Sequence, residues 1–170
     1  REATVLAHLE TFRTLPATPR VRQTHDGRPY ARTEDGRCLH VFERIDGTAG
    51  LPANVHAGTE QALRALARLH RAMAELSAEP ASTVAWLLQR HRRVNARIAP
   101  TMAQELAANY TAVLQHMAAR LSAAASWIPG PVQWLHGDFH PGNLLFVDGR
   151  MHGILDFDEV GLGSPQLELA

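Results

Sequence analysis

The sequence contains no lysine. All 17 basic residues of the 170-residue chain are arginines, and they balance 17 acidic residues, so the formal net charge at pH 7 is zero. A chain without excess charge gives no general reason to expect a nucleic acid or an anionic membrane as partner. No apolar run approaches the roughly 20 residues of a transmembrane helix, and we expect no signal peptide. Cys38 is the only cysteine, which excludes an intramolecular disulfide and favours a cytoplasmic location.

Charge is distributed unevenly along the chain. Residues 131–170 carry six acids against one base, so the first 130 residues carry 16 arginines against 11 acids. The acidic C-terminal quarter could bind cations or form a solvated surface. The chain begins at Arg1, inside an expected helix, and we expect it to be a piece of a longer protein. Nothing in the sequence indicates its oligomeric state.

The first 45 residues predict a helix followed by a small antiparallel sheet. Apolar residues recur at helical spacing over 2–12, and Pro16 breaks the pattern. Cys38 lies in the expected strand 37–42, where apolar and polar residues alternate, and we expect its side chain to be buried and inert. Three strand-like runs cover residues 20–24, 29–33 and 37–42. Two Asp-Gly turns join these runs.

Residues 46–170 predict a mostly helical region followed by short strands. Three glycines and a proline indicate a linker over 46–58. Three helices should follow, with Thr59, Ser82 and Thr101 as their N-caps. The expected strands cover 132–135, 144–147 and 152–156, with Asp148-Gly149 closing the last two into a hairpin.

Residues 135–147, LHGDFHPGNLLFV, crowd polar side chains into one loop. Asp138 follows a strand, a proline and a glycine then force a turn, and Asn143 stands at the mouth of the next strand. Asp156 ends the returning arm of the hairpin, so its side chain and that of Asn143 can face one pocket. Carboxylate and amide oxygens are hard ligands that suit Mg²⁺.

The spacing from Asp138 to Asn143 is that of a protein-kinase catalytic loop. HGDFHPGN followed by ILDFDEVGLGSP resembles the aminoglycoside phosphotransferase family, which also includes choline, homoserine and related small-molecule kinases. RALARLH at 64–70 and VFERIDG at 41–47 resemble a helix and the interlobe hinge of that family. The resemblance implies an α+β, protein-kinase-like two-lobed fold. Residues 1–45 would be the remnant of the N-lobe, and 46–170 the C-lobe.

The resemblance implies an ATP- and Mg²⁺-dependent kinase acting on a hydroxyl of a small molecule. Asp138 would accept or orient the proton of the attacking hydroxyl. Asn143 and Asp156 would hold Mg²⁺ against the ATP phosphates. The acceptor could contact His140, Asp158 and Glu159, which lie near this loop in the sequence; a loop-stabilising role for His140 and a solvated position for the two acids stay open.

The resemblance also implies where the nucleotide binds. The hinge backbone, at Glu43, Arg44 and Ile45, would contact adenine. Glu2 falls where the family's helical glutamate pairs with a lysine that holds ATP phosphates. That lysine and the glycine-rich loop should lie upstream of Glu2, and Glu168 stands where an aspartate is usual. The fragment by itself would therefore bind ATP weakly or not at all.

Two other function classes stay open at this point. A metal-dependent hydrolase could take its ligands from the polar cluster, since H-x-D-x-H is a plausible ligand string; the candidates are His136, Asp138, His140, His152, Asp156 and Asp158. A non-catalytic, kinase-like binding module is the second alternative. In the kinase interpretation, His136 packs and forms hydrogen bonds rather than reacting.

Overall fold

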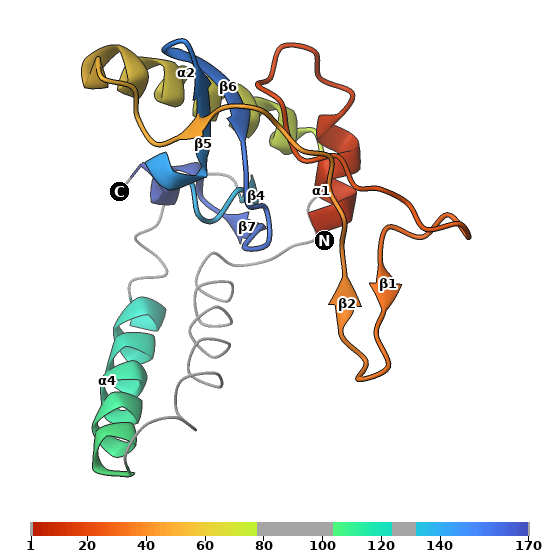
Figure 1. Cartoon of the computed structure of the whole chain (residues 1–170). Helices are drawn as coiled ribbons and strands as arrows, with labels where there is room; N and C mark the ends of the chain where they lie inside the picture. The colour runs from red at the N-terminus through yellow and green to blue at the C-terminus, as the bar shows by residue number, and fades with distance from the viewer. Residues whose placement is uncertain (1, 78–103, 124–131, 170) are drawn as a thin grey trace. The chain divides into compact units, whose positions relative to one another are not determined.

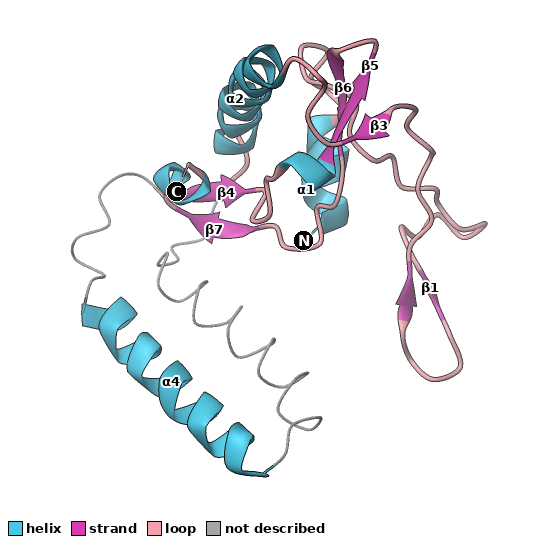
Figure 2. Ribbon diagram, turned by 60° about the vertical axis from the view of Figure 1, so that its left-hand side comes forward, coloured by secondary structure: helices cyan, strands magenta, loops and turns pink. Residues whose placement is uncertain are grey.

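The computed structural model describes residues 2–77, 104–123 and 132–169 (Figure 1, Figure 2). The chain divides into two compact units, residues 1–77 with 134–161 and residues 78–133 with 162–170. The lobe boundary between residues 45 and 46 stays a prediction. No helix in the described ranges is long and apolar enough to cross a membrane.

α1 (Glu2–Leu9) opens the larger unit and buries one face. Val5 and Leu6 are completely buried on that face. The helix is shorter than the predicted 2–12. The Thr11 and Phe12 N–H groups donate to carbonyl oxygens three residues back, which tightens and ends the last turn.

A narrow ribbon of two strands, β1 (Ala31–Arg32) and β2 (Cys38–Leu39), follows α1. The strand predicted over residues 20–24 is wrong in extent. These residues contribute only an isolated bridge between Val21 and Phe42. Both strands are exposed throughout, so no buried face extends the pairing.

Two details of this ribbon bear on the sequence predictions. Both expected Asp-Gly turns are confirmed, since the Gly27 and Gly36 N–H groups donate back to the Thr24 and Thr33 carbonyls. Cys38, predicted to be buried, is exposed. Alternation of apolar and polar residues along a strand indicates a buried face only where another element packs on that face.

α2 (Val55–Ala74) is a 20-residue helix that starts earlier than predicted. Its N-cap is Asn54, whose side chain accepts a hydrogen bond from the Ala57 N–H at 3.1 Å. Thr59 is therefore inside the helix and not its cap. Gly58, expected in a linker, is a buried helical residue; a Cβ there would lie 2.5 Å from the Pro52 ring.

A three-stranded antiparallel sheet lies against α2. Its order is β3 (Thr48–Ala49), β5 (Leu144–Val147) and β6 (Arg150–Ile154). α2 runs alongside the β5–β6 hairpin in both views (Figure 1, Figure 2). β5 and its turn are as predicted, with Asp148 and Gly149 both at positive φ, 49° and 73°. β3 was not predicted, because it lies within the expected linker.

Gln61 of α2 fixes the hairpin turn to the helix. Its amide nitrogen donates to the Gly149 carbonyl at 3.0 Å, and its amide oxygen accepts from the Met151 N–H at 3.0 Å. Both ends of one side chain are thus used. The turn is held by a polar clamp as well as by apolar packing.

The core of this unit joins α1, α2 and the hairpin. Its buried residues are Val5, Leu6, Leu9, Ala62, Leu69, Ala72, Met73, Leu144, Phe146, Ile154, Phe157 and Val160. The site described below therefore stands on packed elements rather than on the ribbon.

We expect Leu69→Ala to lower the free energy of unfolding by about 2–5 kcal/mol, because it empties a fully buried core position. Leu63→Ala, the same change on the same helix, should cost less than about 0.5 kcal/mol, because Leu63 is 51% exposed. Urea denaturation of the full-length protein measures both. Equal losses would contradict this packing of α2.

Outside this core the described elements are few. β4 (Gln133–Leu135) and β7 (Gly161–Gly163) form a two-stranded sheet. α4 (Gln104–Ala123) and the short helix η4 (Pro165–Glu168) belong to the second unit. The helix predicted from Ser82, and the cap Thr101, lie outside the described residues.

Candidate active site

The loop that joins β4 to β5 carries the polar cluster. Pro141 opens a short 3-10 turn, η3 (Pro141–Asn143), and His140 is its N-cap. The His140 Nδ1 atom accepts from the Gly142 N–H at 3.0 Å, and the His140 carbonyl accepts from the Asn143 N–H at 2.9 Å. These bonds turn the chain sharply enough for Asn143 to face back toward Asp138.

Asn143 is bonded to Asp138 through its side-chain amide. Its Nδ2 donates to the Asp138 carbonyl at 3.0 Å and to Asp138 Oδ2 at 3.2 Å. Because both bonds use the amide nitrogen, the amide oxygen points elsewhere and can act as a ligand. His140 Nε2 lies 3.5 Å from the same Oδ2. The structure therefore brings Asp138, His140 and Asn143 together.

The predicted linker supports this loop from the other side. The Gly50 N–H lies 3.1 Å from the Pro141 carbonyl and 3.2 Å from the Leu144 carbonyl, and donates to both. Gly50 directly follows β3, which pairs with β5. η3 is therefore fixed at both of its ends by backbone hydrogen bonds.

Leu155 connects the loop to the returning arm of the hairpin. Its N–H donates to the Asn143 carbonyl at 2.8 Å, and its carbonyl lies 2.9 Å from His136 Nε2. Asp156 is the next residue. One bond from the loop backbone and one from the His136 side chain thus fix the backbone that leads into Asp156.

His136 is fully buried and has both ring nitrogens engaged. Nδ1 accepts from the Asp138 N–H at 3.3 Å, so Nε2 carries the proton and donates to Leu155. The ring also packs 4.5 Å from the Phe157 ring and meets Phe139 edge to face. This is the packing and hydrogen-bonding role expected from the sequence.

Asp156 adopts a left-handed backbone conformation, with φ at 63°. Such a conformation is uncommon for a residue other than glycine, and it persists where the surroundings impose it. Here the hydrogen bonds of Leu155 and the buried Phe157 ring flank the residue on both sides. The strain therefore lies at the end of the arm that sequence analysis assigned to metal binding.

Asp156 and three other acidic side chains interact at the end of the hairpin. Burial raises the pKa of Asp158 to about 6, helped by a hydrogen bond with Asp156 and by the charges of Asp156, Glu159 and Glu2. Burial also raises the pKa of Glu2, with Asp156 adding to the effect and His40 opposing it. Glu2 of α1 thus faces the same negative region as the hairpin end.

Gly137 makes the closest backbone approach in the site. Its φ is 87°, and a Cβ atom at this position would lie 2.2 Å from the Glu159 carbonyl oxygen. Only glycine fits this geometry without moving one of the two segments. Gly137 therefore holds the loop against the chain that follows Asp156.

The hinge residues lie apart from this cluster. Glu43, Arg44 and Ile45 line a cavity of about 540 Å³ together with residues of the segment after α1, and none of Asp138, Asn143 or Asp156 lines it. In the described ranges, neither the Glu43 carbonyl nor the Ile45 N–H takes part in a hydrogen bond. The Glu43 N–H donates to the Arg20 carbonyl at 2.9 Å.

A cluster of metal-binding histidines is not found in the described part of the chain. No group of three or more His, Cys, Asp or Glu residues is placed there to hold a metal ion. His136 has both nitrogens engaged with the backbone, and His152 lines the separate cavity. The ligand string H-x-D-x-H therefore does not converge.

An aspartate and an asparagine in one loop, followed by an aspartate at the end of the next hairpin, define the class of kinase-like phosphotransferases. The family model described as the phosphotransferase enzyme family (APH) matches residues 1–170. The chain belongs to this family, and the expected α+β, kinase-like fold is confirmed.

Several solved structures that share this fold are phosphotransferases. The apo form of a thermostable mutant of aminoglycoside phosphotransferase APH(4)-Ia superposes with a TM-score of 0.61 at 16% identity, covering 99% of this chain and 58% of that one. Macrolide 2'-phosphotransferase MphH from Brachybacterium faecium gives 0.50 at 22% identity, covering 96% and 54%. APH(2'')-IIa gives 0.55 at 14% identity, covering 96% and 55%.

These identities establish a common fold and no more. The chain spans less than three fifths of the length of these solved relatives. No curated protein matches the sequence.

Proposed function

We propose that this chain forms part of an ATP- and Mg²⁺-dependent kinase that transfers the γ-phosphate to a hydroxyl group of a small molecule. The observation that carries the proposal is the pair of bonds to Leu155, which tie Asp156 to the loop of Asp138 and Asn143. Further support comes from the complexes formed by the solved relatives. APH(4)-Ia binds ADP with hygromycin B, and APH(2'')-IIa binds ATP with streptomycin.

The donor set around the loop suits Mg²⁺. The two hydrogen bonds of Asn143 use its amide nitrogen, so its amide oxygen can bind a metal ion. Asp156 is exposed at the end of the hairpin. Both are hard oxygen ligands of the kind Mg²⁺ prefers. Bound Mg²⁺ would neutralise charge on the β- and γ-phosphates.

The hinge suits adenine in a similar way. Adenine presents a donor next to an acceptor, and the Glu43 carbonyl and Ile45 N–H offer the complementary pair. The Arg44 side chain is ion-paired with Asp46 at 3.3 Å, so Arg44 would contribute through its backbone alone. Glu2, set in the acidic region near Asp156, would need a cationic partner such as the family's lysine.

In the proposed reaction Asp138 acts on the acceptor. Its carboxylate accepts the proton of the attacking hydroxyl as the oxygen bonds to the γ-phosphorus. The bond from that phosphorus to the β–γ bridging oxygen breaks, and ADP leaves. Because such a transition state is loose, correct placement of the carboxylate matters more than its basicity. Asn143 and His140 supply that placement.

Acidic side chains also suggest the kind of acceptor. Asp158 and Glu159 extend the negative region beside Asp156, and His140 lies at the loop. We propose that these three residues contact the acceptor. Ammonium groups on the acceptor would be attracted to the two carboxylates.

We expect Asp156→Asn to raise the Mg²⁺ concentration needed for half-maximal turnover by about tenfold or more, because a charged ligand becomes neutral. Asp148→Asn is the matched control, since Asp148 also has a positive φ but lies at the turn of the hairpin. Turnover of ATP by the full-length protein over a Mg²⁺ titration measures both variants.

Three outcomes would contradict the proposal. An unchanged Mg²⁺ dependence in Asp156→Asn would remove Asp156 from the metal site. Stoichiometric zinc in the purified protein would favour the hydrolase. Mg-ATP binding without transfer to any member of a broad hydroxyl panel, or to water, would favour the non-catalytic binding module.

A further inference from the structure

We propose that Asp46-Gly47 is the site of a spontaneous covalent modification of this protein, the isomerisation of Asp46 to isoaspartate. The chain contains four Asp-Gly pairs, at residues 26–27, 35–36, 46–47 and 148–149. Glycine hinders attack by its own nitrogen least, because it has no side chain. The four pairs share this chemistry, but their surroundings in the fold make them unequal.

The reaction takes place between the Asp46 side chain and the main chain that follows it. The Gly47 nitrogen bonds to the Asp46 Cγ atom, the bond from Cγ to the hydroxyl oxygen breaks, and water leaves with the amide proton. Water then adds to the Asp46 main-chain carbonyl carbon, and the bond from that carbon to the Gly47 nitrogen breaks. The product has the same mass, and its main chain runs through Cγ. The reaction is favoured by an amide without a hydrogen bond and by a carboxyl group that can turn toward it and take up a proton.

The Gly47 N–H group is not held by a hydrogen bond. The Gly50 N–H donates to the Leu144 carbonyl of β5 at 3.2 Å. Hydrogen-bonded residues alternate along an antiparallel strand, so the Gly47 N–H points away from β5. β3 is an edge strand of its sheet, and no group in the described ranges accepts a hydrogen bond from Gly47.

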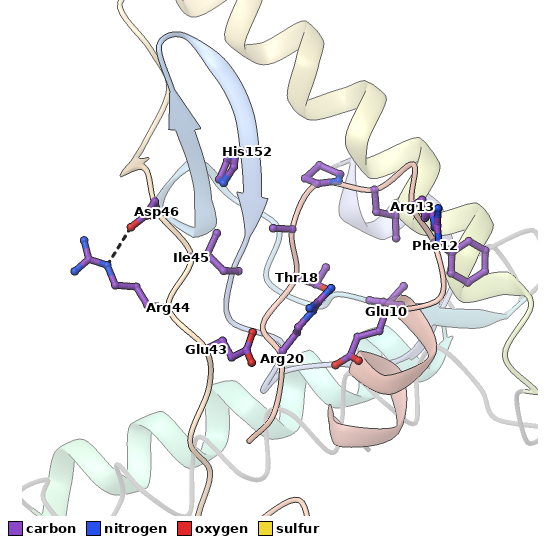
Figure 3. Close-up of a pocket in the computed structure, with 14 residues that line it drawn as sticks. Glu10, Phe12, Arg13, Thr18, Arg20, Glu43, Arg44, Ile45, Asp46 and His152 are labelled. Carbon is purple, nitrogen blue, oxygen red and sulfur yellow. Dashed lines mark ion pairs between the residues drawn. The ribbon is translucent and has the colours of Figure 1, made fainter. Parts of the chain in front are cut away.

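The Asp46 carboxylate is held only weakly. Its partner is Arg44, at 3.3 Å, and the two side chains are 82% and 89% exposed. Figure 3 shows this pair directed away from the other labelled residues. An ion pair so exposed to water contributes little, so the carboxyl group can leave it and turn toward Gly47.

Asp26-Gly27 is protected at both reacting groups. The Gly27 N–H donates to the Thr24 carbonyl at 2.9 Å. The Thr24 hydroxyl donates to the Asp26 carboxylate, which also pairs with Arg28 at 2.8 Å. The hydrogen bond from Thr24 lowers the pKa of Asp26. Asp26 is therefore kept in its ionised form, which lacks the hydroxyl group that must leave.

Asp35-Gly36 repeats this protected arrangement, since THDGR at 24–28 and TEDGR at 33–37 share one pattern. The Gly36 N–H donates to the Thr33 carbonyl at 2.9 Å. The Thr33 hydroxyl donates to the Asp35 carboxylate, and Arg37 pairs with it at 2.6 Å. Thr33 and Arg37 lower the pKa of Asp35. Both turns of the ribbon should therefore resist isomerisation.

Asp148-Gly149 is protected by the conformation of its turn. Both residues have a positive φ, 49° and 73°, and Gln61 of α2 bonds to the Gly149 carbonyl at 3.0 Å. Bringing the Asp148 carboxyl group onto the next nitrogen would rotate this peptide unit out of the turn and break that bond. Asp46 is the one pair of the four without such protection.

The modification would alter the support of the catalytic loop. It inserts one extra main-chain atom just before β3, between the hinge and the strand. Gly50 at the far end of β3 donates to the Pro141 carbonyl. A longer main chain before β3 should therefore disturb the pairing that fixes η3.

The test follows isoaspartate in the full-length protein stored at neutral pH. Because the chain lacks lysine and trypsin does not cut before Pro29, tryptic peptides 23–32, 33–37, 45–64 and 121–150 each contain one of the four pairs. Isoaspartate is recognised by altered retention at unchanged mass, and by methylation with purified protein L-isoaspartyl methyltransferase and S-adenosylmethionine. We expect it to form at Asp46 about tenfold faster than at Asp26 or Asp35, because each of those must first break its hydrogen bonds. An equal or faster rate at any of the other three pairs would overturn the proposal.

The same measurement in urea separates structure from sequence. Unfolding removes the protection, so the four rates should become similar. A preference for Asp46 that persists in the unfolded chain would assign it to the local sequence and overturn the structural argument.

Two variants complete the test. Thr24→Val removes the hydroxyl that holds Asp26 and should raise the rate at Asp26 about fivefold, with the rate at Asp46 unchanged. Asp46→Glu would require a larger ring and should abolish the signal in peptide 45–64. An unaltered rate at Asp26, or a signal that persists in Asp46→Glu, would contradict the proposal. None of these readouts depends on the proposed kinase activity.

Discussion

Asp138→Asn should reduce the turnover number for phosphoryl transfer by about three orders of magnitude. The asparagine has the same shape and can still meet the Asn143 amide, but it cannot accept the proton of the acceptor hydroxyl. The loop should keep its conformation, because its backbone is held by His136, His140 and Gly50 rather than by the Asp138 carboxylate. Affinity for Mg-ATP should therefore change by less than about threefold.

The measurement compares turnover and nucleotide affinity in the same full-length preparation. Turnover is followed with an acceptor found by screening, or with water through slow ATP hydrolysis. Asp148→Asn serves again as the matched control. Loss of Mg-ATP binding with unchanged turnover of the bound nucleotide would assign Asp138 to the metal site and contradict the role proposed for it.

Gly137→Ala should lower the free energy of unfolding by more than about 2 kcal/mol and reduce transfer at least about tenfold. The added Cβ would lie 2.2 Å from the Glu159 carbonyl oxygen, a backbone atom that no side-chain rotation can move. Relief requires a shift of the loop or of the segment after Asp156. Either shift separates the two carboxylates that the reaction needs.

Gly149→Ala isolates the steric part of this effect. Gly149 also has a positive φ, 73°, but a Cβ there would meet nothing within 4 Å. It should lose only the roughly 1–2 kcal/mol of the left-handed backbone and leave transfer unchanged. Urea denaturation and turnover measure both variants, and equal effects would rule out a tight contact between Gly137 and Glu159.

The polar loop was predictable because its information is local. Asp138, Asn143 and the turn between them lie in one short segment, and the turn at Asp148 folds the chain back on itself, although a register shift between Leu145 and Phe146 sets which residues finally pair. The family resemblance rests on the same residues. Fold class and family therefore followed from the sequence, while the roles of the individual site residues stay predictions.

Other features carried no readable signal. Leu155 forms its two bonds through its own main-chain groups, with the Asn143 carbonyl and the His136 ring as partners, so its side chain gave no sign of them. The partners of Gln61 lie far away in the sequence, so its position on a helix does not indicate the contact. Gly58 was misread because glycine serves both as a helix breaker and as a site of close packing.

Leu155 offers a way to watch the catalytic loop without altering it. Its amide hydrogen is bonded to the Asn143 carbonyl, so exchange with deuterated solvent requires that the loop and the hairpin arm separate. The exchange rate of this one proton therefore measures how often the two halves of the site come apart. Because the side chain of Leu155 makes neither bond, that rate can be followed as nucleotide or acceptor is added, with every functional group intact.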